Sequence, residues 1–374
     1  MHALSFASEL IKFDTVSSKS NLEASDYIER QLQSLEFDTE TVPYERDGVI
    51  KVNVIARKGH GTGGIAYFGH TDVVPVDDWS IDDHGPFEPT VCGSRLYGRG
   101  STDMKGSIAC MLSAVVSLKD QNQQRPMFVC CSADEELDHR GINEVVNRSE
   151  IYRELVVAKA CGIVGEATGM NVVYAHKGGV QIVVKSQGKA AHSSTHEGVN
   201  ANWAMIPFLQ EMKKIHDETR HDLKSSDNEF DPPSICLNIG INDHTKAVNI
   251  TAPQSICTLC FRPMPNTNVD SIIHRIQTSA ETFGLQFEIS GRNPAFWRDP
   301  TGPFSTACTR ICGGVAPSTV AYGSEAGNLT EVEQLIVLGP GDISQAHKSD
   351  EWISLQQLEN GTEKYQQILK QFCY

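Results

Sequence analysis

Residues 65–72 read Ile-Ala-Tyr-Phe-Gly-His-Thr-Asp, an apolar run that ends in a His-x-Asp pair. The apolar run predicts a buried strand. Because side chains two residues apart on a strand point to the same face, we expect His70 and Asp72 to lie side by side. A histidine whose second ring nitrogen is held by a carboxylate is a common metal ligand. The pair alone does not establish a metal site, but later motifs carry the same residue types.

Acidic and imidazole side chains recur at the ends of later apolar runs. They are Asp103 before the helical run 108–118, Glu135 and Glu136 after 127–133, Glu166 after 161–164, and His347 after 335–338. The carboxyl ends of strands in an open α/β sheet converge on one crevice. Each residue alone has a structural explanation, such as a helix cap for Asp103. Their recurrence predicts one site whose ligands suit zinc, and also cobalt or manganese.

These motifs resemble those of the two-zinc amidohydrolases and peptidases, a family that includes acetylornithine deacetylase, succinyl-diaminopimelate desuccinylase, carboxypeptidase G and aminoacylase. The resemblance spans essentially the whole chain. It is carried by six stretches: residues 69–75, 96–106, 133–136, 164–168, 188–194 and 338–347. The last stretch and the loop around Glu325 look most like the deacetylase branch.

The resemblance implies two zinc ions and five ligands. Asp103 would bridge both ions; His70 and Glu166 would complete one site, and Glu136 and His347 the other. Two metals held in this way can share one hydroxide and a scissile carbonyl between them.

The resemblance also assigns residues that do not bind metal. Glu135, next to the ligand Glu136 but on the opposite side of the chain, would be the general base. Asp72 would hold the His70 ring. The peptide bond between Asp103 and Met104 is expected to be cis.

The middle of the chain has a different pattern, which predicts an inserted domain over residues 178–291. Its expected elements are strands at 180–184, 234–239, 255–261 and 285–289, and helices at 200–217 and 269–283. This β-α-β-β-α-β order is ferredoxin-like. The flanking segments, 1–177 and 292–374, alternate strands and helices. They predict an α/β catalytic domain, a mostly parallel sheet with helices on both faces.

The resemblance makes the insert a dimerisation and lid domain and implies a homodimer. His192 would then reach the active site of the opposing subunit and stabilise the oxyanion. Asn249 and Arg262 resemble substrate-binding positions, with the arginine suited to a bidentate contact with an α-carboxylate. Glu325 is the expected contact for a cationic side chain. From the residues alone, the favoured interpretation of His192 is a surface histidine next to two serines, and the prolines after Arg262 equally mark a strand end.

Composition limits the possible partners and compartment. The 374 residues carry a net charge of −15, which argues against nucleic acid as a partner. No apolar run is long enough to span a bilayer, and residues 1–12 predict an amphipathic helix rather than a signal peptide. The 11 cysteines lack the spacing of a disulfide framework, which indicates reduced thiols in a cytoplasmic protein.

We therefore expect a metal-dependent hydrolase that cleaves the amide bond of a small acyl amino acid. The deacetylase-like stretches imply N-acetylornithine as the substrate, with ornithine and acetate as products. Other acylamino-acid hydrolases remain open, namely an acetylcitrulline deacetylase, a desuccinylase, an aminoacylase or a dipeptidase. A non-catalytic metal-binding protein on the same fold is the alternative from a different class.

Overall fold

The computed structural model describes residues 3–221 and 226–374, and the chain divides into two compact units. The first unit comprises the residues up to Ala175 together with Trp297–Ser318 and Ser324–Tyr374. The second comprises His176–Phe296 and Thr319–Gly323. The insert expected from the sequence covered 178–291 and did not include the short segment 319–323.

A nine-stranded sheet organises the first unit, in the order β1-β2-β6-β3-β7-β15-β8-β13, with β14 beside β8. The strands are β1 Asp38–Arg46, β2 Val49–Lys58, β3 Ile65–His70, β6 Met127–Ser132, β7 Cys161–Val164, β8 Val173–His176, β13 Phe296–Trp297, β14 Ser318–Val320 and β15 Leu335–Val337. Its centre is parallel, because β6, β3, β7 and β15 pair with one another in that sense. Strands β1 and β2 join one side of this centre in antiparallel pairing.

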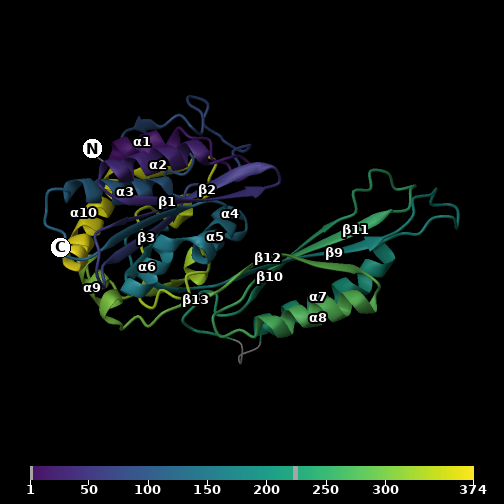
Figure 1. Cartoon of the computed structure of the whole chain (residues 1–374). Helices are drawn as coiled ribbons and strands as arrows, with labels where there is room; N and C mark the ends of the chain where they lie inside the picture. Colours follow the sequence, from purple (N-terminus) through teal and green to yellow (C-terminus); the bar gives the residue numbers. More distant parts are fainter. Residues whose placement is uncertain (1–2, 222–225) are drawn as a thin grey trace. The chain divides into compact units, whose positions relative to one another are not determined.

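Helices cover both faces of this sheet (Figure 1). On one face, Ile65 and Tyr67 share an apolar core with side chains of α1 Ala3–Ile11, α2 Leu22–Ser34, α3 Lys105–Ser117, α9 Pro303–Ile311 and α10 Leu355–Cys373. On the other face lie α5 Arg140–Arg148 and α6 Glu150–Ala158. All six residues of β3 are buried, as a strand covered on both sides requires. The expected α/β fold class is confirmed.

Shorter elements complete the first unit. A three-stranded sheet of β4 Thr90–Cys92, β5 Arg95–Tyr97 and β16 Trp352–Ser354 has β5 at its centre. The single turn α4 Glu135–Asp138 follows β6, and two 3₁₀ turns, η1 Glu325–Gly327 and η2 Ile343–Gln345, lie near the end of the chain. The first helix, expected over residues 1–12, is α1; residues 1 and 2 lie outside the described residues.

The second unit is a four-stranded antiparallel sheet with two helices. Its elements are β9 Gly179–Gln187, α7 Asn202–His221, β10 Cys236–Asn242, β11 Gln254–Arg262, α8 Val269–Thr282 and β12 Gln286–Asn293. The strand order β10-β11-β9-β12 leaves β10 and β12 at the edges. Both the order of elements and the order of strands are those of a ferredoxin-like domain.

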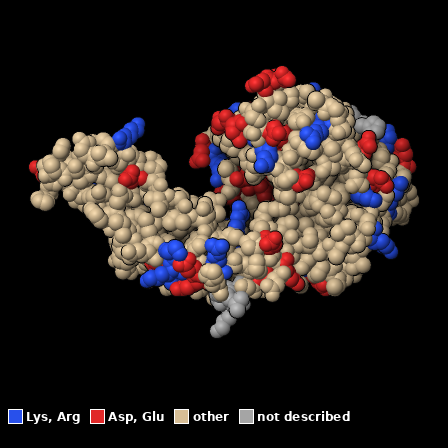
Figure 2. Space-filling model, turned by 180° about the vertical axis from the view of Figure 1, so that it is seen from behind, with Lys and Arg blue, Asp and Glu red and all other residues tan. Residues whose placement is uncertain are grey.

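The surface carries mixed charge. On the face seen in Figure 2, the Lys and Arg side chains are scattered among Asp and Glu and do not gather into one basic field. Among the described residues, no helix combines the length and apolarity that a membrane crossing needs.

Candidate active site

The site in the first unit is built at the carboxyl ends of β6, β3 and β7. His70 is the last residue of β3, Glu135 and Glu136 open α4 just beyond β6, and Glu166 follows β7. Asp103 precedes α3, and His347 follows η2 from the far end of the chain. The structure therefore brings together all five expected ligands and the expected base. Parallel neighbours end at the same sheet edge, which is why residues so far apart in sequence meet.

Asp103 lies between two imidazole rings. Its Oδ1 atom is 3.1 Å from Nε2 of His70, and its Oδ2 atom is 3.3 Å from Nε2 of His347. A glutamate accompanies each ring: Oε1 of Glu166 lies 3.7 Å from His70 Nε2, and Glu136 lies 3.1 Å from His347 Nε2. The donors thus form two sets that share one carboxylate, and each set could hold one divalent ion.

Several of these acids are buried together, which makes their charges costly. Burial and then the charge of Asp103 raise the pKa of Glu136 to about 8. The same two causes raise the pKa of Glu166 well above its ordinary value. Burial opposes the ionisation of Asp103, but hydrogen bonds from His347 and His70 lower its pKa overall. Cations of higher charge than an imidazolium would relieve this repulsion, so the donor set fits two divalent metal ions.

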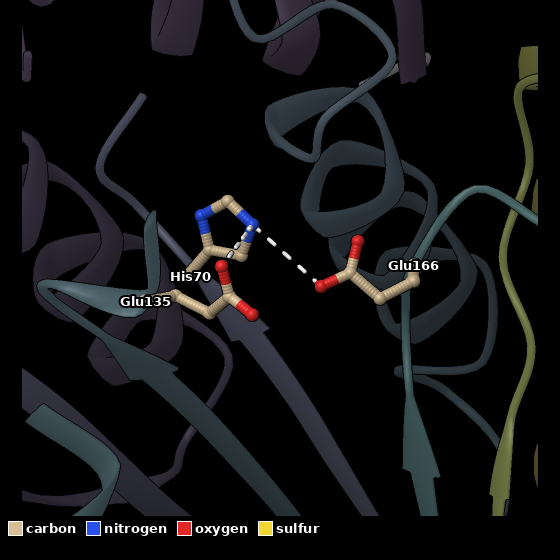
Figure 3. A group of neighbouring side chains, drawn as sticks. All are labelled: His70, Glu135 and Glu166. Atoms are coloured by element: carbon tan, nitrogen blue, oxygen red, sulfur yellow. Dashed lines mark ion pairs between the residues drawn. The ribbon is translucent and has the colours of Figure 1, made fainter. Parts of the chain in front are cut away.

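Glu135 also approaches the cluster, as Figure 3 shows, with His70, Glu135 and Glu166 pointing toward one another. Its Oε2 atom is 3.9 Å from His70 Nε2, but its Oε1 atom lies 3.2 Å from Nε2 of His139. One oxygen is therefore held by a histidine outside the cluster, and the other faces inward. Glu136, by contrast, contacts Nε2 of His347, the same atom that Asp103 contacts. This difference supports the assignment of Glu135 to proton transfer and of Glu136 to the metal.

Asp72 has different partners from those expected. The His70 ring bonds through Nδ1 to the backbone carbonyl oxygen of Asp72 at 2.9 Å, whereas the carboxylate oxygen is 3.7 Å away. The carboxylate instead accepts hydrogen bonds from the backbone N–H groups of Glu135 and Glu136, at 3.1 and 3.3 Å. The backbone carbonyl group of Asp72 therefore orients the His70 ring. Its carboxylate orients the α4 turn.

The α4 turn is held between two residues in the left-handed conformation, Asp134 at φ 57° and His139 at φ 59°. Such backbone costs roughly 1–3 kcal/mol per residue and persists where the surroundings enforce it. Buried Asp134 accepts from the Tyr44 hydroxyl at 2.8 Å and pairs with Lys51 Nζ at 2.9 Å. Arg46 binds Asp134 and also forks onto both oxygens of Asp138, so it ties the two ends of the turn together.

The loop that carries Asp103 is fixed by a buried carboxylate, Glu351. It accepts from the backbone N–H groups of Gly100, Thr102 and Asp103 at 2.9, 2.8 and 3.1 Å, and pairs with Arg99 at 3.0 Å. The Asp103–Met104 peptide bond is cis, which confirms that expectation.

The remaining predicted residues lie elsewhere. His192 and Asn249 are exposed in the second unit, where His192 and Ile250 form an antiparallel bridge that brings their segments together. Arg262 ends β11 of the same unit. Glu325 lies in the first unit, is 1% exposed and accepts a hydrogen bond from the Ser132 hydroxyl. The roles of these four residues stay predictions.

Sequence reasoning missed His139 and Glu351. His139 had a local signal, since it follows Glu135 by four residues. Glu351 had none, because its partners lie about 250 positions earlier in the chain.

Comparison with known proteins gives a family match. Residues 66–371 match Peptidase family M20/M25/M40. Two curated relatives are acetylornithine deacetylases. The one from Pasteurella multocida (strain Pm70) is 30% identical over 99% of this chain and 98% of its own length. The one from Myxococcus xanthus is 31% identical over 98% of this chain and 96% of its own.

Solved structures show the same fold at lower identity. The dipeptidase Dug1p from Saccharomyces cerevisiae superposes with a TM-score of 0.78 at 16% identity, covering 99% of this chain and 96% of that one. The M20 metallo-carboxypeptidase Sso-CP2 from Sulfolobus solfataricus gives a TM-score of 0.76 at 17% identity, covering 99% of both chains.

The shared carboxylate predicts how zinc content responds to substitution. After zinc loading and dialysis, we expect about two zinc ions in the wild-type chain and about one in Glu166→Gln or His347→Ala. Asp103→Asn should lose both, since it serves both donor sets. Elemental analysis measures this, with His84→Ala as the control, because His84 packs between Trp79 and Tyr97. Full zinc content in Asp103→Asn would contradict the shared ligand.

Proposed function

The chain belongs to Peptidase family M20/M25/M40 and is a metal-dependent amidohydrolase, and we propose that it removes the acetyl group from N-acetylornithine. The observation that carries the proposal is Asp103, whose two oxygens face two imidazoles from opposite ends of the chain. Beside it, Glu135 has one oxygen on His139 and the other toward the cluster. The substrate is proposed from the two relatives, both of which are acetylornithine deacetylases. We propose zinc as the metal and Asp103, His70, Glu166, Glu136 and His347 as its ligands.

Two bound divalent ions would supply the positive charge that polarises a carbonyl oxygen and brings the pKa of water toward neutrality. Glu135 Oε2 faces the cluster and takes a proton from the attacking water. The same oxygen then delivers that proton to the departing amine. Burial opposes the ionisation of Glu135, but the charge of His139 and its hydrogen bond lower the pKa, so the carboxylate is ready to accept a proton.

Removing this proton carrier should separate chemistry from binding. We expect Glu135→Gln to keep its zinc and its KM but to lose about 10²–10⁴-fold in kcat, the usual contribution of a general base. Glu333→Gln is the matched control, because Glu333 is exposed and lies outside the six motif stretches. Steady-state kinetics with metal analysis checks both. A loss of less than about tenfold in Glu135→Gln with zinc intact would assign the base elsewhere.

Glu325 is the proposed source of preference for a cationic side chain. Because the carboxyl is buried against Ser132, we propose that it acts on a bound cation through its charge. Burial and then the charge of Glu135 raise its pKa to about 7. A nearby cation would favour the ionised form of Glu325. The ionised carboxylate would in turn attract a substrate with a cationic side chain.

This proposal predicts a selective defect. Glu325→Gln should lower kcat/KM for acetylornithine more than for acetylcitrulline, which has a similar length but no charge. A panel that adds succinylated amino acids and dipeptides covers the rival substrates. Equal losses on acetylornithine and acetylcitrulline would make Glu325 a structural residue, and wild-type preference for acetylcitrulline would overturn the substrate.

We also propose a homodimer formed through the second unit, with His192 acting in the partner's site. Strands β10 and β12 present edges, and Ile239 and Ile241 of β10 and Ile289 of β12 are exposed. Exposed sheet edges are surfaces that native proteins usually cover. The 11 free thiols support a further proposal, that the enzyme works in the cytoplasm.

Subunit exchange tests the action of His192 in trans. Glu135→Ala and His192→Ala, each inactive, are refolded together. Random pairing makes half of the dimers mixed, each with one working site, so about a quarter of wild-type activity should return. If exchange is demonstrated and no activity returns, His192 does not act in the partner's site.

A further inference from the structure

His139 connects the expected general base to the body of the first unit. Its ring is buried, and its two nitrogens have different partners. Nε2 lies 3.2 Å from Glu135 Oε1, and Nδ1 lies 2.8 Å from the side-chain oxygen of Asn328. The ring is therefore held at both ends, between the base and a residue nearly 190 positions later in the chain.

The partners of Asn328 fix which atoms carry hydrogen. Its NH₂ group donates to the side-chain oxygen of Asn143 at 2.9 Å, so its carbonyl oxygen is the atom that faces His139. Nδ1 of His139 must then be the donor. With Nδ1 as the donor to Asn328, Nε2 of the protonated ring donates to Oε1 of Glu135.

The backbone places the ring for this contact. His139 ends α4 in the left-handed conformation, at φ 59°, and its N–H donates to the carbonyl oxygen of Asp134 at 3.0 Å. Its own carbonyl oxygen accepts from the backbone N–H of Asn143, in the first turn of α5. The bend turns a side chain four residues after Glu135 back onto that residue's carboxyl group.

We propose that His139 is a positioning residue for Glu135: it holds Oε1 so that Oε2 alone faces the metal-binding cluster. This inference rests on the proposed role of Glu135 as the base. A glutamate free to turn could place both oxygens among His70, Asp103 and Glu166 and act as a further ligand. Holding one oxygen outside the cluster keeps the carboxylate in place for proton transfer and prevents that competition.

Two substitutions separate the contact from the backbone conformation. In His139→Gln, the amide nitrogen lies near the position of Nε2 and can still donate to Glu135. In His139→Asn, the amide is near Nδ1, so the bond to Asn328 can persist while the bond to Glu135 is lost. Asparagine also tolerates the left-handed conformation better than most residues, so His139→Asn should strain the turn less than His139→Gln.

We expect kcat to fall when the contact between His139 and Glu135 is lost, and to change little when only the backbone of the turn is strained. His139→Asn should lose about 10–100-fold in kcat, the range for residues that orient a catalytic group, with KM and zinc content unchanged. His139→Gln should retain most of the wild-type kcat. In the Glu135→Gln background, His139→Asn should have no further effect, because the two residues act as one unit.

A spectroscopic measurement on the metal-free protein tests the contact itself. With ¹⁵N-labelled histidine, the Nε2 resonance of His139, assigned by its absence in His139→Asn, should shift in Glu135→Gln and stay in place in Glu333→Gln. An unchanged Nε2 resonance in Glu135→Gln would overturn the inference. So would wild-type kcat in His139→Asn, or equal losses in His139→Asn and His139→Gln.

The proposed function and the positioning role of His139 are contradicted by different results. If Glu135→Gln retains its activity, the base is wrong, and His139 has no base to position. If Glu135→Gln loses activity while His139→Asn does not, the proposed function stands and the positioning role fails.

Discussion

Mutual repulsion among buried carboxyl groups is the constraint on which this structure depends. Asp103, Glu135, Glu136 and Glu166 form one cluster, and two imidazoles lie among them. The raised pKa values of Glu136 and Glu166 reflect burial and the nearby charge of Asp103. A protein holds such a cluster only where its surroundings enforce the positions, and the cluster in turn becomes a strong site for divalent cations.

The rest of the first unit supplies that enforcement. Central parallel strands bring His70, Glu136 and Glu166 to one edge, and Glu351 fixes the Asp103 loop through three backbone N–H groups. The α4 turn is held by a hydrogen bond to the Asp72 carboxylate and by the contacts of Arg46 with Asp134 and Asp138. Three residues here are in the left-handed conformation, since His347 joins Asp134 and His139 at φ 62°. Such strain is typical of catalytic sites and is maintained by the contacts around it.

Much of this could be predicted from sequence because the signals are local. Apolar runs with an acid or a histidine at their ends predict both the strands and the place where His70, Glu135 and Glu166 meet. The contacts that were missed depend on geometry that no local pattern encodes. The Asp72 carboxylate accepts hydrogen bonds from the N–H groups of the α4 turn, which follows the left-handed Asp134, and lies 3.7 Å from the His70 ring. Glu351 and Asn328 reach their partners across long sequence separations, and buried Glu325 accepts a hydrogen bond from Ser132, 193 positions earlier.

The central claim is that two metal ions share Asp103 while Glu135 stays unbound. A crystal structure of the zinc-loaded protein, with data collected on both sides of the zinc absorption edge, tests it most directly. The account predicts two anomalous peaks about 3.5–4 Å apart, one on each side of the Asp103 carboxylate. His70 and Glu166 should contact one peak, and His347 and Glu136 the other, with Glu135 Oε1 still bonded to His139. A single peak held by His70, Glu135 and Glu166 would contradict both the shared ligand and the free base.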